Sequence, residues 1–286
     1  MSLKKIILSA DSSCDLGPHL KSKYNVNYSR FHILLDNRSY LDGIDLSSND
    51  IFTIYRQTKN LPKTSAIGVG EYYEYFKQWT DKGFEVIHIN ISSSISSTYQ
   101  NCCIAANELD GVYPIDSKNL TTGMGLLVIE AAKRIENGLS AKEIQTEITN
   151  LAQNVQTSFV LDTLEFLCAG GRCSTLSAMG ANILKLKPCI EVNNNTGTMA
   201  LGKKYRGSLD KVLIQYTDEK LANIDKINKE RIFITHTMQS PELIELVYNH
   251  IKDLNVFNEI HITDASCTVS SHCGPNTLGL IFLNNN

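Results

Sequence analysis

The sequence lacks the features of membrane and secreted proteins. Its 286 residues contain no apolar stretch of 18 residues, so we expect no stable membrane insertion. The first residues, MSLKKIILSADSS, reach an acid and hydroxyls after a short apolar run, which is too early for the apolar core of a secretory signal peptide. We therefore expect a soluble, cytoplasmic protein.

Clustered positive charge and paired cysteine motifs are also missing. The formal net charge is −3, and the 27 basic residues are spread along the chain, so no basic stripe is available for nucleic acid. The eight cysteines include no C-x-x-C pair, and the usual zinc and redox motifs are excluded by spacing. We expect no nucleic-acid partner, no metal site and no cofactor.

Signatures of nucleotide-binding and hydrolytic enzymes are incomplete. The segment GTMALGKK nearly matches the phosphate-binding loop G-x-x-x-x-G-K-[ST], but Lys204 stands where a magnesium-binding hydroxyl is required. GVGEYY and GMGLLV lack the third small residue of a dinucleotide fingerprint, and no G-x-S-x-G nucleophile motif occurs. An enzyme of either class would have to rely on other residues.

What the sequence does contain is a regular alternation of strand and helix patterns. In the first half, the strand patterns KKIILSADSS, FEVIHINI and GVYPIDS alternate with helix patterns such as GEYYEYFKQWTDKG and LTTGMGLLVIEAAKRIENG. Ser140 and Glu143 form a capping box for a further helix. This pattern predicts an α/β fold in which residues 1–156 form a three-layer α/β/α domain with a parallel sheet.

The second half shows more closely spaced strand patterns. TSFVLDTL, PCIEVN and TMALGKKYRG follow one another, and the turn NNNTG between the last two predicts a hairpin. Helix patterns near 208–224 and after Ser240 separate the later strands RIFITHTM, EIHITDAS and TLGLIFL. Residues 157–286 are therefore predicted to form a C-terminal α/β domain with a mixed sheet.

Hydroxyl side chains gather in ISSSISSTYQ, where the strand FEVIHINI ends and a helix is predicted from about residue 97 to 109. Open α/β sheets bind ligands at the carboxyl ends of their parallel strands. A helix start offers unpaired N–H groups and a positive dipole end, which favour an anion. Helix capping by Ser96 or Ser97 is the structural alternative, since a cap needs only one hydroxyl.

Three further segments carry candidate functional side chains. Thr64 and Ser65 precede a predicted helix, and local turn or cap hydrogen bonds are the structural alternative there. His272, in SSHCGPNTLG, is predicted to lie in a Gly-Pro turn between two strands, where it has a functional or a purely structural role. Arg172 follows a double glycine in LCAGGRCS, and pairing with a nearby acid is its structural alternative.

Six segments, in this order and spacing, resemble the DegV family of bacterial fatty-acid-binding proteins: ADSSCDL, KTSAIGVGEYYEYF, INISSSISSTYQNC, YPIDS, DTLEFLCAGGRCS and SSHCGPNTLG. The similarity extends from about residue 4 to 284. It implies two α/β domains that hold a long-chain fatty acid such as palmitate, stearate or oleate between them, with the acyl tail in an apolar tunnel. It also implies a carrier that is not itself an enzyme and presents its ligand to a separate fatty acid kinase catalytic subunit, which makes an acyl-phosphate in fatty acid metabolism.

The resemblance also implies roles for individual residues. Six side chains match or flank the positions that bind the carboxylate: Thr64, Ser65, Ser96, Ser97, Thr98 and His272. Arg172 matches the arginine of the family's G-G-R motif, which implies docking to the kinase subunit. Ser97 and Asn276 stand where the family usually has glycine.

Two other hypotheses remain open. One is a stand-alone enzyme, either a small-molecule phosphotransferase acting on a carboxylate or a serine hydrolase with Ser96 as nucleophile and His272 as base. It predicts turnover without a partner and an acid that orients His272, which the sequence does not identify. The other is a lipid-responsive interaction module whose partner is not a kinase, and it predicts that partner binding is lost when the ligand is removed.

Overall fold

The computed structural model describes residues 5–36, 38–172 and 186–285, and within these residues the strands form three sheets. The first sheet has four strands in the order β2-β1-β6-β7, and all of its pairings are parallel. Its strands are β1 Ile6–Asp11, β2 Asn27–Ser29, β6 Glu85–Asn90 and β7 Val112–Asp116. The predicted parallel sheet of the first half is confirmed.

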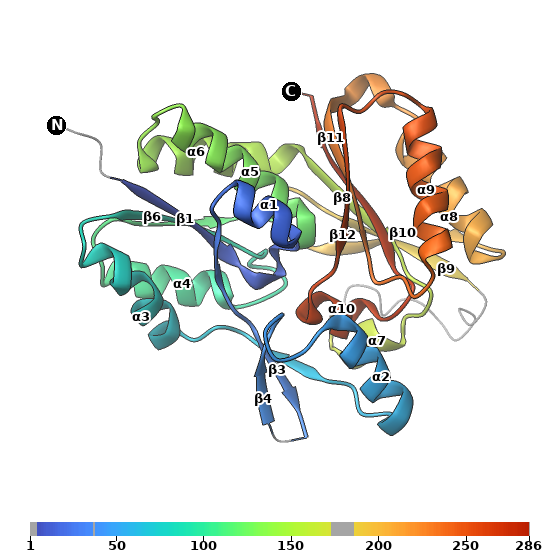
Figure 1. The fold of residues 1–286 in the computed structure, drawn as a ribbon, viewed down its shortest axis with the longest axis horizontal. Helices are drawn as coiled ribbons and strands as arrows, with labels where there is room; N and C mark the ends of the chain where they lie inside the picture. Colours follow the sequence, from blue (N-terminus) through green and yellow to red (C-terminus); the bar gives the residue numbers. More distant parts are fainter. Residues whose placement is uncertain (1–4, 37, 173–185, 286) are drawn as a thin grey trace.

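Helices cover both faces of this sheet. Figure 1 shows α3 and α4 on one face and α5 and α6 on the other. The bounds are α1 Gly17–Lys23, α3 Val69–Thr80, α4 Thr98–Asn107, α5 Thr121–Glu136 and α6 Ala141–Leu151. The predicted capping box is present, with Ser140 accepting from the backbone N–H of Glu143. Within the described residues, no helix combines the length and the apolar character needed to cross a membrane.

The second sheet has six strands in the order β10-β9-β8-β13-β11-β12. Only the β11–β12 pairing is parallel among those described, so the predicted mixed sheet is confirmed, as is the β9–β10 hairpin. The bounds are β8 Val155–Val160, β9 Lys187–Val192, β10 Met199–Tyr205, β11 Ile227–His236, β12 Glu259–Asp264 and β13 Leu278–Asn284. Helices α8 Leu209–Lys220 and α9 Pro241–Asp253 lie beside this sheet (Figure 1). The domain boundary at residue 156 stays a prediction.

A third, smaller sheet was not foreseen from the sequence. It is antiparallel in the order β4-β3-β5, with β3 His32–Leu35, β4 Arg38–Leu41 and β5 Lys63–Ser65. Three short helices lie near it in Figure 1: α2 Ser48–Thr58, α7 Glu165–Ala169 and α10 Cys267–Cys273. Strands of three or four residues are too short to give a periodic pattern, which explains why they were missed.

Helix α5 lies between the two large sheets and contacts strands of both: β1 and β6 of the first, and β8, β11 and β13 of the second. The first turns of α5 contain glycines, Gly123 and Gly125, at positions where other parts of the protein come very close to the helix. A Cβ on Gly125 would lie 2.9 Å from the carbonyl oxygen of Cys14 and 2.8 Å from Cδ2 of Leu16. Glycine therefore allows α5 to pack closely against the loop that follows β1.

We expect Gly125→Ala to lower the free energy of unfolding by about 1–3 kcal/mol, because the added methyl overlaps a backbone oxygen that cannot easily move. Gly70→Ala is the matched control. Gly70 is an exposed residue of α3 with no atom within 4 Å of an added Cβ, so alanine there should stabilise the protein by up to about 1 kcal/mol. Urea unfolding of both variants measures the difference, and equal effects would contradict the close packing of α5.

Candidate functional site

The short elements β5 and α10 bring two predicted site residues together. Thr64 lies in β5, and its Oγ1 is 2.8 Å from Nε2 of His272, which is 208 positions later in the chain. His272 lies in the last turn of α10, so the prediction that it sits in a turn between two strands was wrong. The side chain of Ser266 caps this helix, and the Gly-Pro turn begins only after Cys273.

The buried carboxyl groups of Asp15 and Asp42 hold the N-terminal end of α10. The backbone N–H of Ser266 donates to Asp15 Oδ1 over 3.0 Å, and that of Cys267 donates to Asp42 Oδ1 over 2.9 Å. Thr268 Oγ1 adds a third donor, 2.8 Å from Asp42 Oδ2. Burial raises the pKa of Asp15 to about 8 even though the hydrogen bonds that it accepts lower it, and the neighbouring charge of Asp42 raises it further. Neither acid was recognised in the sequence.

The imidazole of His272 is held in its neutral form. Burial lowers its pKa to about 4, because an apolar surrounding disfavours the charged ring, and the positive charge of Arg172 acts in the same direction. Its Nδ1 has no hydrogen-bond partner among the described residues and lies against Gly170. A Cβ on Gly170 would be only 2.1 Å from this nitrogen, so the ring requires glycine at that position.

The tautomer of His272 decides what Thr64 can do. A neutral imidazole carries one N–H. If the proton is on Nε2, the ring donates to Thr64 Oγ1 and no buried N–H is left unpaired, which is the arrangement that protein interiors favour. The hydroxyl hydrogen of Thr64 is then free to point into the adjacent cavity and to donate to an acceptor there. The pair can therefore bind an anion without itself carrying a positive charge.

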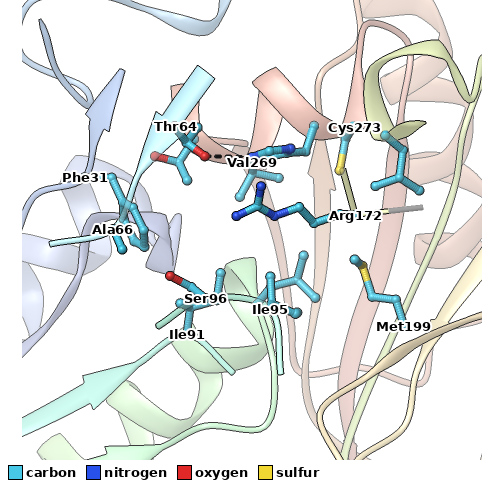
Figure 2. A pocket seen from close by; sticks show the side chains of 14 residues that line it. Phe31, Thr64, Ala66, Ile91, Ile95, Ser96, Arg172, Met199, Val269 and Cys273 are labelled. Carbon is cyan, nitrogen blue, oxygen red and sulfur yellow. Dashed lines mark hydrogen bonds between the residues drawn. The ribbon is translucent and has the colours of Figure 1, made fainter. Parts of the chain in front are cut away.

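A cavity lies between these elements. It encloses about 520 Å³ of space free of protein atoms, including open solvent at its mouth. Most of its lining is apolar, and it includes Phe31, Ile91, Leu167 and Met199. Its polar lining comes from Thr64, Ser96, Arg172, Thr268 and His272. Figure 2 shows Thr64, Ser96 and the guanidinium of Arg172 directed into the same space.

The serine run that follows β6 has two separate roles. Ser92 Oγ donates to the carbonyl oxygen of Gly197 over 2.9 Å, and Ser94 Oγ donates to that of Thr196 over 2.6 Å. These two hydroxyls fasten the end of β6 to the turn of the β9–β10 hairpin. Ser96 is the member of the run that lines the cavity, and its Oγ also accepts from the backbone N–H of Thr98 over 3.3 Å.

The other three predicted carboxylate ligands do not line this cavity. Ser65 Oγ donates to the adjacent carbonyl of Ala66 over 3.4 Å, and strand alternation places it on the opposite face of β5 from Thr64. Ser97 is exposed at the start of α4. Thr98 is buried, and its Oγ1 lacks a hydrogen-bond partner among the described residues. Adjacent positions point in different directions, which the motif alone does not reveal.

Arg172 also lies at the cavity. Its Nη1 donates to the carbonyl oxygen of Gly170 over 2.8 Å, which directs the half-buried side chain inward. Among the described lining residues, it is the one that is positively charged at neutral pH. The resemblance implied kinase docking for this residue, and its place in the cavity lining was not foreseen.

Asn276 and Ser97, which stand where the resemblance implies glycine, differ in backbone conformation. Asn276 has φ of 58°, in the left-handed region that asparagine tolerates better than most residues, so it reproduces a conformation typical of glycine. Ser97 has φ of −78° and needs no such freedom. No cluster of His, Cys, Asp and Glu side chains suited to a metal ion occurs in the part of the chain that the structure describes.

The lowered pKa of His272 predicts a pH-dependent stability. The unfolded chain takes up a proton near pH 6.5 and the folded protein only near pH 4, so the free energy of unfolding should fall as pH drops from 6.5 to 4. The loss from this residue should be about 3 kcal/mol. Urea unfolding across this pH range compares the wild type with His272→Gln. In the variant, the free energy of unfolding should lack the part of the pH dependence that comes from His272.

His19→Gln is the control for that experiment, because His19 is exposed in α1. Its pH profile should match that of the wild type. Identical slopes for the wild type and His272→Gln would contradict the buried, neutral state of His272.

Comparison with known proteins finds a family and relatives that match nearly the whole length of the chain. The model of a family described as "Uncharacterised protein, DegV family" matches residues 5–285. A DegV domain-containing protein of Clostridium acetobutylicum is 30% identical over 287 residues, covering 98% of this chain and 99% of its own. Another, from Clostridium perfringens, is 29% identical over 283 residues with the same coverage.

Solved structures share the fold. A fatty acid-binding DegV family protein from Thermus thermophilus is 23% identical, with a TM-score of 0.90 over 98% of this chain and 100% of its own. A stearic acid-binding protein from Eubacterium ventriosum is 23% identical, with a TM-score of 0.85 over 99% of this chain and 98% of its own. At these identities, the likeness establishes the fold alone. Because the family model spans nearly every residue, this chain belongs to the DegV family.

Proposed function

We propose that this protein binds a long-chain fatty acid in the cavity, with the carboxylate at Thr64, Ser96 and His272. The observation that carries the proposal is the division of the lining into one polar group of side chains and an otherwise apolar wall. Such a division suits a molecule with a single anionic end and a long hydrocarbon chain. Structural neighbours that bind fatty acids, including stearic acid, support the same ligand class.

The acyl tail supplies most of the binding free energy. Burying about fifteen methylenes at roughly 0.8 kcal/mol each contributes on the order of 12 kcal/mol, before the cost of ordering the chain is subtracted. The polar end then has to replace the water that the carboxylate loses on entering. The hydroxyls of Thr64 and Ser96 offer two donors, and Arg172 offers a charged group nearby.

We also propose that the bound fatty acid is presented to a separate kinase subunit. The hydroxyls of Thr64 and Ser96 hold the carboxylate by single hydrogen bonds and Arg172 adds its charge from nearby, which leaves an oxygen accessible to a phosphoryl donor. The carrier is favoured over a serine hydrolase by the hydrogen bonding of His272. Its Nε2 bonds Thr64 instead of Ser96, and its Nδ1 has no acid partner among the described residues.

The headgroup site can be tested by replacing its hydroxyls. We expect the purified wild type to release about one equivalent of long-chain fatty acid when it is denatured and extracted, as measured by mass spectrometry. Thr64→Val with Ser96→Ala should raise the Kd for palmitate roughly tenfold or more, because hydrogen bonds to a charged group are lost. Ser94→Ala is the matched control, since Ser94 bonds the carbonyl of Thr196 and does not line the cavity.

A wild type that releases no fatty acid, and that takes up neither palmitate nor oleate when these are supplied, would exclude fatty-acid binding. A double variant that binds as tightly as Ser94→Ala would leave the cavity without its assigned headgroup site.

Arg172 allows the binding and docking roles to be separated. We expect Arg172→Gln to raise the Kd for palmitate about tenfold, because the cavity loses its positive charge. A role in docking alone would leave this Kd unchanged and would lower only acyl-phosphate formation when a fatty acid kinase subunit and ATP are added. Titration of both proteins with palmitate, followed by the kinase assay at saturating ligand, distinguishes the two roles.

A further inference from the structure

A buried polar cluster surrounds the carboxyl group of Asp11, the last residue of β1. Asp11 Oδ1 accepts a hydrogen bond from the phenol of Tyr72 on α3. Two residues of β6 reach the same oxygen: Nε2 of His88 lies 3.1 Å away, and Nδ2 of Asn90 lies 3.3 Å away. All four side chains are fully buried. A carboxyl group in such a place is tolerated because several donors replace the water that it has lost.

The other oxygen of this carboxyl group holds the segment that carries Ser96. Asp11 Oδ2 accepts from the backbone N–H of Ile91 over 2.9 Å, at the point where β6 ends and the serine run begins. The carbonyl oxygen of the next residue, Ser92, accepts from the backbone N–H groups of Ile95 (2.9 Å) and Ser96 (3.1 Å). The backbone of Ser96 is therefore tied to Ser92, which directly follows the residue that Asp11 holds.

The loop formed by residues 11–15 also holds α10. At the far end of this loop, Asp15 accepts from the backbone N–H of Ser266. Within the loop, Ser12 Oγ donates to Asp42 Oδ2 over 2.8 Å, and Asp42 is the other acid that binds the start of α10. Residues 11–15 thus connect the serine run to α10 through hydrogen bonds made within a few positions of one another.

The two segments held by this loop carry the two sides of the proposed headgroup site. A carboxylate can accept from both sides only if Ser96 keeps a fixed separation from Thr64 and His272, since hydrogen bonds weaken steeply beyond their normal length. We propose that Asp11 is a positioning residue that sets the place of Ser96 in this site. The inference rests on the proposed function. The described lining of the cavity includes Ile91 and not Asp11, so Asp11 acts through the backbone of Ile91.

Asp11→Ala removes the acceptor of the Ile91 N–H group. We expect the Kd for palmitate to rise about tenfold, as it should for Ser96→Ala, because both variants lose a hydrogen bond to the charged carboxylate. 1-Hexadecanol has the same chain length and an uncharged head group, so its Kd should change by less than about threefold. Titration of each protein with both ligands measures the difference. A general loosening of the protein would weaken both ligands equally, and that result would overturn the inference.

Tyr72→Phe is the matched control. It removes another hydrogen bond of the same carboxyl group and leaves the bond to Ile91 in place, so the Kd for palmitate should equal that of the wild type. An increase as large as that of Asp11→Ala would contradict the role of the Ile91 bond. If Asp11→Ala does not fold, as judged by thermal unfolding, Asp11→Leu combined with Tyr72→Phe removes the bonded pair together and fills the space. Its Kd for palmitate should be about ten times that of Tyr72→Phe alone.

A double-variant cycle tests whether Asp11 acts through Ser96. In the Ser96→Ala background, Asp11→Ala should change the Kd for palmitate by less than about twofold, because the hydrogen bond that it displaces is already absent. Free-energy effects that add independently would overturn the inference, and so would a folded Asp11→Ala variant that binds palmitate like the wild type. A wild type that binds neither palmitate nor 1-hexadecanol contradicts the proposed function itself.

Discussion

The anchoring of α10 by Asp15 and Asp42 is the constraint on which the candidate site depends. This seven-residue helix is too short to be stable alone, so its position is set by what holds it. At its first residues, the buried carboxyl groups of Asp15 and Asp42 accept hydrogen bonds from backbone N–H groups. At its last turn, His272 meets Thr64. Val269, in the middle of the helix, and Cys273, its last residue, line the same cavity as His272, so one helix contributes both polar and apolar lining.

Much of the fold could be predicted because long elements repeat their apolar residues regularly. The parallel sheet, the mixed sheet and the capping box at Ser140 all follow from such local patterns. The small sheet and α10 could not be predicted, because their segments are too short for a periodic signal. In α10, Ser271 is buried and its hydroxyl donates to the carbonyl oxygen of Cys267, a contact that no local pattern indicates.

The site was predicted less completely than the fold. Motif resemblance named Thr64 and His272, but nothing in the spacing of the chain indicates that residues 208 positions apart share a hydrogen bond. Asp15 and Asp42 gave no signal, because single acids near the start of a domain are common and their burial depends on distant segments. Arg172 was identified as a functional residue, whereas its orientation into the cavity depends on the three-dimensional path of the glycines before it.

The long separation between Thr64 and His272 also bears on how the protein is made. During translation, β3, β5 and the serine run leave the ribosome well before α10 and the central strand β13. Contacts between such distant segments form late, since the intervening chain must first be ordered. The growing polypeptide therefore lacks both the cavity wall and the hydrogen-bond partner of Thr64 that α10 supplies. The cavity is complete only after residues 267–273 have been made and packed.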